Sequence, residues 1–193
     1  MREIIIVIMA SLIALPAWAG TVIDTSYIAP DGTRVIRHEL DIPASDGDVY
    51  KAFTTAEGWQ GWAVPFARLS GPFSVGADIE TSYNPGASVG DAGNIRNRVL
   101  AYVPGRFFAF HVAKAPDGFP HADLITKVFT VAEIERRDAG TVHLKLSMLG
   151  YGKGEGYDAL YAFFRKGNAM TMENLKRRFD KGPIDWKTEL APK

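Results

Sequence analysis

The stretch "GYGKGEGYDALYAFF", residues 150–164, decides how the rest of this chain can fold. Four glycines precede a region that continues to residue 179 without proline, and Gly182-Pro183 ends it. Large side chains recur there at spacings of three and four, which predicts a long helix with one inward face. That face holds Tyr157, Leu160, Tyr161, Phe164, Asn168, Met172, Leu175 and Phe179. A helix of this kind needs an apolar surface to cover.

The region before this helix predicts that surface as an antiparallel sheet. Apolar runs lie between turn-forming Gly, Pro, Asn and Asp residues. The expected strands are 33–42, 77–83, 94–103, 106–112, 125–136 and 141–149. Ser45 is a suitable N-cap for a short helix over 48–55, and a second helical turn follows over 57–62. The sequence therefore predicts an α+β helix-grip fold. In this fold a curved antiparallel sheet of about six to seven strands surrounds a long C-terminal helix, with two short helices after the first strand.

Composition excludes several functional classes. The chain has 193 residues, with 22 basic and 22 acidic side chains, so its formal net charge is zero. This balance argues against a non-specific nucleic-acid partner, which requires a basic surface. There is no cysteine, and the four histidines show no zinc-site spacing. We therefore expect no metal and no cofactor.

The first residues have the pattern of an export signal. Arg2 precedes an apolar run over 4–15, and Ala17-Trp18-Ala19 resembles a signal-peptidase site. We expect a signal peptide at 1–19, an N-terminal extension at 20–32, the domain at 33–181 and a loose polar tail at 182–193. The run is shorter than the ~20 residues that span a bilayer. The prediction is a periplasmic or secreted bacterial protein with no stable membrane insertion after cleavage. The alternative is an N-terminal anchor that is not cleaved.

Three stretches, "AFTTAEGWQGW" (52–62), "YVPGRFFAF" (102–110) and "GYGKGEGYDALYAFF", resemble the SRPBCC or START-like superfamily. Within it they are most similar to the Hsp90 ATPase activator homologue family. The likeness extends over residues 34–179 and implies a helix-grip fold around a cavity. Relatives often carry a tryptophan midway along the last helix, where this chain has Gly167 and Asn168. The absence of that ring would widen the cavity.

Aromatic side chains and a few polar ones are the candidates for a binding site. They are Trp59, Trp62, Phe66, Phe110, Tyr157, Tyr161, Phe164, Asn168 and His38. Each can instead be a core residue, because aromatic side chains dominate protein cores as well as apolar pockets. Trp59 and Trp62 are candidates for a lid over the cavity. Among the other histidines, the phase of His143 predicts a solvent-facing ring.

Two patterns leave alternatives open. On the strand at 94–103, either Arg96 and Arg98 or Asn97 face inward, and an inward arginine would need a partner such as Glu80. The glycines at 150–156 match no phosphate-loop motif and favour a turn that leads into the helix.

The function predicted from the sequence is the binding of a small apolar or amphipathic molecule in the cavity. The alternative is a hydrolase or cyclase that uses the same cavity, although no catalytic motif is present. A co-chaperone role follows from the family name, but export argues against it because Hsp90 and its ATP are cytosolic. Neither the ligand nor the oligomeric state is indicated.

Export gives the first test. Signal peptidase should cleave after Ala19, so that the mature chain begins at Gly20. N-terminal sequencing of the protein from its native host checks this. A full-length cytosolic chain that begins at Met1 would contradict it.

Overall fold

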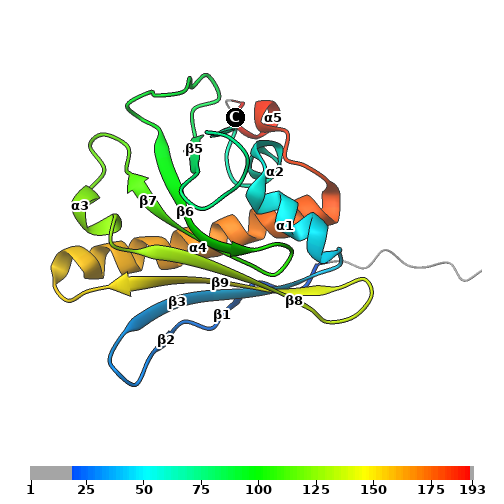
Figure 1. Ribbon diagram of the computed structural model, residues 1–193, viewed down its shortest axis with the longest axis horizontal. Coiled ribbons are helices and arrows are strands. Elements are labelled where there is room, and N and C mark those ends of the chain that lie inside the picture. Colours follow the sequence, from blue (N-terminus) through cyan, green and yellow to red (C-terminus); the bar gives the residue numbers. More distant parts are fainter. Residues whose placement is uncertain (1–18, 192–193) are drawn as a thin grey trace, which may run out of the picture.

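The computed structural model describes residues 19–191 and has the predicted helix-grip architecture (Figure 1). All nine strands belong to one antiparallel sheet, in the order β1-β3-β9-β8-β7-β6-β5-β4, with β2 also paired to β3. The strands are β1 (Ile23–Asp24), β2 (Tyr27–Ile28), β3 (Arg34–Ile42), β4 (Phe66–Leu69), β5 (Asp78–Ser82), β6 (Ile95–Val103), β7 (Phe107–Lys114), β8 (Phe129–Arg136) and β9 (Val142–Tyr151). The helices are α1 (Asp46–Thr54), α2 (Ala56–Gln60), α3 (Ala122–Ile125), α4 (Glu155–Lys181) and α5 (Trp186–Glu189).

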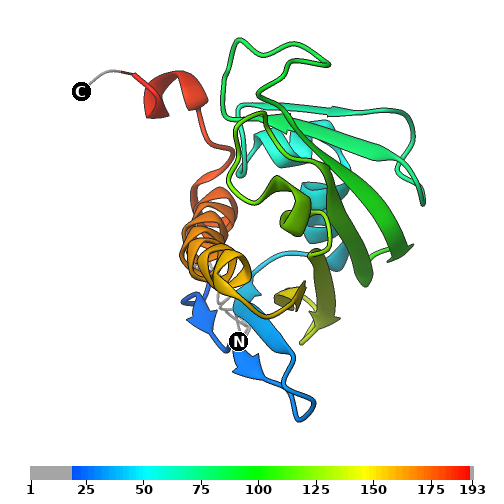
Figure 2. The same ribbon diagram turned by 90° about the vertical axis from the view of Figure 1, so that its left-hand side faces the viewer.

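The long helix α4 lies in the hollow of the sheet. Figure 2 looks along α4 and shows the sheet curving from β3, beneath the helix, round to β4–β6 on the far side. Two apolar clusters hold the helix. Met172 and Leu175 pack with Phe53, Trp62 and other residues of α1, α2 and the sheet. Leu160 packs in a second cluster, with Ile36 and Ile125 among its members. The middle of the helix lies between these two attachments.

Side-chain caps and two glycines fix the shape of the connections. Ser45 Oγ accepts the Asp48 N–H at 3.1 Å to begin α1, and Thr55 Oγ1 accepts the Gly58 N–H at 2.9 Å to begin α2. A Cβ on Gly58 would lie 2.2 Å from the Lys51 carbonyl oxygen, so only glycine lets α2 pack this closely on α1. Gly150, at φ 96°, likewise lies against the Lys127 carbonyl oxygen at the end of β9.

The glycine-rich stretch forms the expected turn into α4. The acidic residues Glu155 and Asp158 occupy the first turn of the helix, where they suit its dipole. Asp158 Oδ1 also pairs with Arg34 at 2.6 Å. These acidic groups make the N-terminus of α4 unsuitable for a phosphate.

The two ends of the described chain are more ordered than the sequence predicts. The extension at 20–32 forms β1 and β2 on the free edge of β3. The tail is not loose, because Ile184 is buried and Trp186 donates its indole N–H to the Gln60 carbonyl. These two short strands and β4 bring the number of strands above the predicted six to seven. The strand predicted at 125–136 begins only at Phe129, and Ile125 is instead the last residue of α3.

The predicted signal peptide lies outside the described residues except for Ala19. Ala19 is buried and donates its backbone N–H to Asp180 Oδ1 at 2.6 Å. No helix among residues 19–191 is both long enough and apolar enough to cross a membrane.

The solvent-facing prediction for His143 is wrong. Its ring is buried between two carboxylates, with Nδ1 2.6 Å from Asp41 and Nε2 2.9 Å from Glu39. Burial would raise the pKa of Glu39, but bonds from Thr25 and His143 lower it. The predicted strand face of His143 is nevertheless correct, because the ring lies on the opposite face of β9 from Leu144 and Leu146. The neighbouring strand β3 supplies both partners that cover it.

His38 lies on the inner face of β3 and is 1% exposed. Neither ring nitrogen has a hydrogen-bond partner among the described residues. Burial lowers the pKa of His38, an effect that Asp24 opposes and Arg165 reinforces. The folded protein therefore favours the neutral ring.

Replacing this histidine should stabilise the fold. His38→Leu removes an unpartnered buried polar group, which should raise the free energy of unfolding at neutral pH by about 1 kcal/mol. The wild type should lose stability as the pH falls below about 6.5, because the unfolded chain takes up a proton that the folded chain resists. Urea unfolding between about pH 5 and 8 measures both effects.

The control for this comparison is His121→Asn. His121 is exposed and has a left-handed backbone conformation that asparagine tolerates, so this variant should keep the wild-type pH slope. A His38→Leu protein that loses as much stability as the wild type towards pH 5 would show that His38 does not cause the loss.

Candidate functional site

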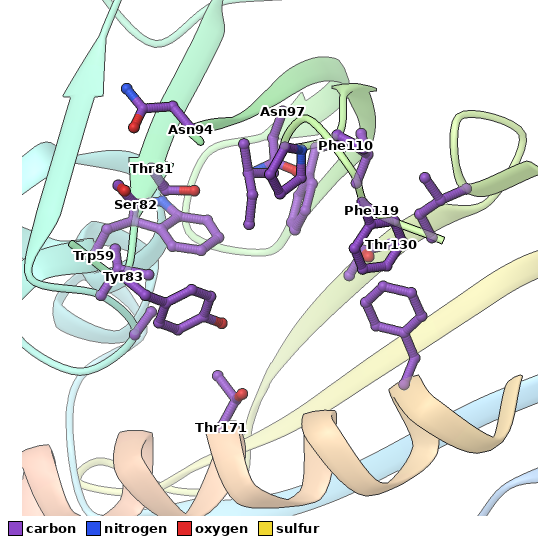
Figure 3. Close-up of a pocket in the computed structure, with 18 of the residues that line it drawn as sticks. Trp59, Thr81, Ser82, Tyr83, Asn94, Asn97, Phe110, Phe119, Thr130 and Thr171 are labelled. Atoms are coloured by element: carbon purple, nitrogen blue, oxygen red, sulfur yellow. The ribbon is translucent and has the colours of Figure 1, made fainter. Parts of the chain in front are cut away.

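A cavity of about 680 Å³ lies between the middle of α4 and the sheet. Its walls come from α1, α2, the strands β5–β9, the loops at 83–94 and 115–121, and α4. Figure 3 shows the hollow with Trp59 and Tyr83 on one side, Phe119 on the other and Thr171 of α4 below. The two apolar clusters close the protein at either end of the helix, and the cavity occupies the space between them.

One wall is a fixed aromatic surface. The Trp59 and Trp62 rings stack at 5.7 Å between centroids, and Phe110 meets Trp59 edge-on at 5.8 Å. The indole N–H of Trp59 donates to the Phe53 carbonyl at 2.6 Å, and that of Trp62 donates to the Ala52 carbonyl at 2.9 Å. Both rings are buried and tied to α1. They therefore form a rigid wall, whereas the sequence left open a lid or core packing for these two rings.

The opposite wall is the middle of α4. Phe163, Phe164, Asn168 and Thr171 line the cavity. Gly167 lies four residues from both Phe163 and Thr171 and so shares their face of the helix. A Cβ built on Gly167 would have no atom within 4 Å. The missing side chain at this position leaves room in front of the helix.

A polar strip runs along the sheet side of the cavity. It consists of Thr81 on β5, Asn97 on β6 and Thr130 on β8, which are all buried and all line the hollow. Asn97 is thus the inward residue of its strand, while Arg96 and Arg98 face outward. Their partner is Asp78, at 2.8 Å from Arg98, rather than the Glu80 considered from the sequence.

Tyr83 and Asp91 belong to the loop region between β5 and β6. Tyr83 is 66% exposed, and Figure 3 shows its ring and hydroxyl pointing into the hollow. A tyrosine hydroxyl has an ordinary pKa of about 10, so it is protonated at neutral pH. Asp91 is the one charged residue among the described residues that line the cavity. Its carboxylate accepts the Ser88 N–H at 2.8 Å within the loop.

Five of the nine predicted site residues meet at this cavity, namely Trp59, Trp62, Phe110, Phe164 and Asn168. The Asn168 amide donates to the Met148 sulfur at 2.9 Å, so a neighbouring side chain supplies its partner.

The other four do not line it. Phe66 lies on the opposite face of β4 from the buried Ala67. Tyr157 and Tyr161 pack in the cluster at the start of α4, where Tyr161 meets Tyr151 at 5.2 Å. His38 shares the inner face of β3 with Leu40, close to Arg165 of α4, outside the cavity.

Sequence reasoning missed Tyr83 and the polar strip. Strand alternation places Thr81 and Tyr83 on the same face as the buried Ile79, so the phase was readable. For β6 the sequence did not indicate whether Asn97 or its neighbours Arg96 and Arg98 face inward. No local pattern indicates that polar side chains on three separate strands would meet.

The fold has known counterparts. A solution structure of the Aha1 dimer from Colwellia psychrerythraea is 19% identical, with a TM-score of 0.59 over 77% of this chain and 97% of that one. Protein MLL2253 from Mesorhizobium loti is 18% identical, with a TM-score of 0.59 over 78% and 100%. Norcoclaurine synthase from Thalictrum flavum is 16% identical, with a TM-score of 0.50 over 75% and 87%. No family model and no curated protein sequence matches the chain.

These likenesses confirm the predicted fold. The protein has a helix-grip architecture, in which a curved antiparallel sheet surrounds the long helix α4. Its similarity to Aha1 agrees with the resemblance to the Hsp90 ATPase activator homologue family seen in the sequence. At these identities the likeness concerns the fold alone, and the chemistry has to be argued from the cavity.

Gly167 gives a test of the cavity-facing side of α4. Glycine inside a helix is less stable than alanine, and here the added methyl group would enter open space. Gly167→Ala should therefore raise the free energy of unfolding by about 0.5–1 kcal/mol. Chemical denaturation measures the change. A loss of stability would mean that this face of the helix is packed rather than open.

Proposed function

We propose that this protein is an exported binding protein that holds one small apolar or amphipathic molecule in the cavity beside α4. The observation that carries the proposal is a cavity of about 680 Å³ with a fixed aromatic wall. Cavities of roughly 300–1,000 Å³ with mainly apolar linings are typical binding sites for small molecules. Protein interiors are otherwise close-packed, so a hollow of this size has a high energetic cost unless something fills it.

Rigid aromatic walls suit this role. Trp59 and Trp62 are already held by hydrogen bonds to the α1 backbone, so a ligand would not have to order them. Less conformational entropy is then lost on binding, which favours affinity. The norcoclaurine synthase structure is a complex with dopamine and hydroxybenzaldehyde, and both are small aromatic molecules. This precedent supports an aromatic or similarly compact ligand for the present cavity.

Catalysis is less well supported than binding. General acid–base chemistry needs a group that titrates near the working pH, most often histidine. Among residues 19–191, the cavity lining contains no His, Lys, Arg or Glu, and its ionisable side chains are Tyr83 and Asp91. His38, the histidine considered for such a role, is outside the cavity. The proposal is therefore a binding protein rather than a hydrolase or cyclase.

The signal-peptide pattern at 1–19 supports a periplasmic or secreted location, and this is part of the proposal. The likeness to Aha1 lends a co-chaperone role no independent support, because it extends only to the fold. An exported protein would also be separated from cytosolic Hsp90.

Filling the cavity tests the proposal. Gly167→Trp places a large ring in front of α4, whereas Gly167→Ala adds one methyl group and is the matched control. The wild type and Gly167→Ala should bind pyrene, and Gly167→Trp should bind it at least about tenfold more weakly while it remains folded. Fluorescence titration measures affinity, and circular dichroism measures folding. A wild type that fails to bind, or equal binding by all three proteins, would refute the proposal.

A further inference from the structure

The polar strip has hydrogen-bonding capacity that the protein itself does not use. Thr81 is 2% exposed, Asn97 5% and Thr130 8%. None of the three side chains forms a hydrogen bond with another residue in the range 19–191. Their polar atoms are not sealed off, because all three residues line the cavity. Buried polar groups are normally paired, and these three face the cavity, where a bound molecule is able to pair with them.

The register of the sheet places these three groups along the sheet side of the cavity. Asn97 lies opposite Ile79 on β5 and Val112 on β7, so it is an isolated amide between apolar neighbours. Thr81 is two residues beyond Ile79, on the same face. Thr130 pairs with Phe110 on the next strand. Figure 3 shows Thr81 and Asn97 on the sheet side, across the open space from Thr171 of α4.

These groups could bind an oxygen function. The Asn97 amide offers both a donor and an acceptor, and each threonine hydroxyl can act as either. Asn94 does not add to this set, because its Oδ1 is sealed off from the cavity and its Nδ2 donates to Glu80 and Ser88. An uncharged hydroxyl or carbonyl matches this mixture, because both donors and acceptors are available to it.

The cavity is also a poor site for a negatively charged group on the ligand. The one charged residue that lines it within 19–191 is Asp91, which lies on an exposed loop. Arg96 and Arg98 point to the other face of β6, where Asp78 holds them. A carboxylate on the ligand would lose its hydration and find no cationic partner among the lining residues within 19–191. Unpaired buried charge is strongly unfavourable.

We infer that the ligand is a neutral molecule with an apolar body and one or two uncharged oxygen functions, which bind Asn97 and Thr81. The apolar body lies along Trp59, Phe110 and Phe164. This inference rests on the proposed binding function and names the chemical class that the site selects. Asn97 determines specificity rather than overall affinity, because the aromatic wall binds the apolar body without it.

Three related probes separate the contribution of the aromatic wall from that of the polar strip in the mature protein. They are pyrene, pyrenemethanol and pyrenecarboxylate. The wild type should bind pyrenemethanol about tenfold more tightly than pyrene, as expected for one or two added hydrogen bonds. It should bind pyrenecarboxylate at least about tenfold more weakly than pyrenemethanol. Fluorescence titration at neutral pH gives all three affinities.

Asn97→Leu should remove the preference by weakening pyrenemethanol about tenfold while pyrene affinity stays the same. Thr81→Val, which keeps the shape of the side chain, should weaken pyrenemethanol severalfold and serves if Asn97→Leu does not fold. Asn174→Leu is the matched control, since Asn174 is on α4 but does not line the cavity. It should bind all three probes as the wild type does.

The outcomes distinguish the two proposals. Equal wild-type affinity for the three probes, or an Asn97→Leu protein that loses pyrene and pyrenemethanol alike, would overturn the inference and leave the binding function standing. Failure of the wild type to bind any of the probes would overturn the binding function, and the inference with it.

Discussion

The structure depends on a mismatch of width: a single helix has to cover the inner face of a much broader sheet. A helix with its side chains is about 10 Å across, and each strand adds about 4.8 Å to the width of a sheet. α4 meets the sheet closely near its ends, where Leu160 enters one apolar cluster and Met172 and Leu175 enter the other. Between these attachments the curved sheet stands away from the helix. The cavity is the space that this geometry leaves.

Such a space would ordinarily collapse, and two features of the chain keep it open. The stacked Trp59 and Trp62 are large, rigid and tied to α1 through their indole N–H groups, so they cannot swing inward without breaking buried hydrogen bonds. On the helix, Gly167 lies between the cavity-lining Phe163 and Thr171 and has open space where a Cβ would be. The cavity is thus bounded by groups that resist moving into it.

Charge is organised around the outside of this arrangement. Asp78 holds Arg96 and Arg98 on the outer face of β6, and His143 is held between Glu39 and Asp41 on the outer side of β3 and β9. Arg34 and Asp158 join β3 to the start of α4. The acidic and basic groups balance each other at the surface, which leaves the interior of the cavity polar at one wall but almost free of formal charge. This separation is the physical basis for expecting a neutral ligand.

The sequence by itself determined the main elements and their order. The spacing of Leu160, Phe164, Met172 and Leu175 was enough to define the inward face of α4, and alternation with turn residues was enough to define the main strands, because both signals are local periodicities. The resemblance carried by the stretches around Trp59 and Gly150 supplied the architecture. The sequence identified only some of the aromatic residues at the cavity. Trp59 and Phe110 line it as predicted, whereas Tyr157 and Tyr161 pack at one end of the helix instead.

Only the tertiary structure decided which residues face the hollow and which groups find partners. The inward phase of Asn97 depends on how β6 pairs with β5 and β7, since both phases of that strand read alike in the sequence. The burial of His143 depends on Glu39 and Asp41, which are about a hundred residues away along the chain. The polar strip exists because three strands bring Thr81, Asn97 and Thr130 to one wall. Periodicity reports the face on which a side chain lies, but pairing between distant strands determines what it meets there.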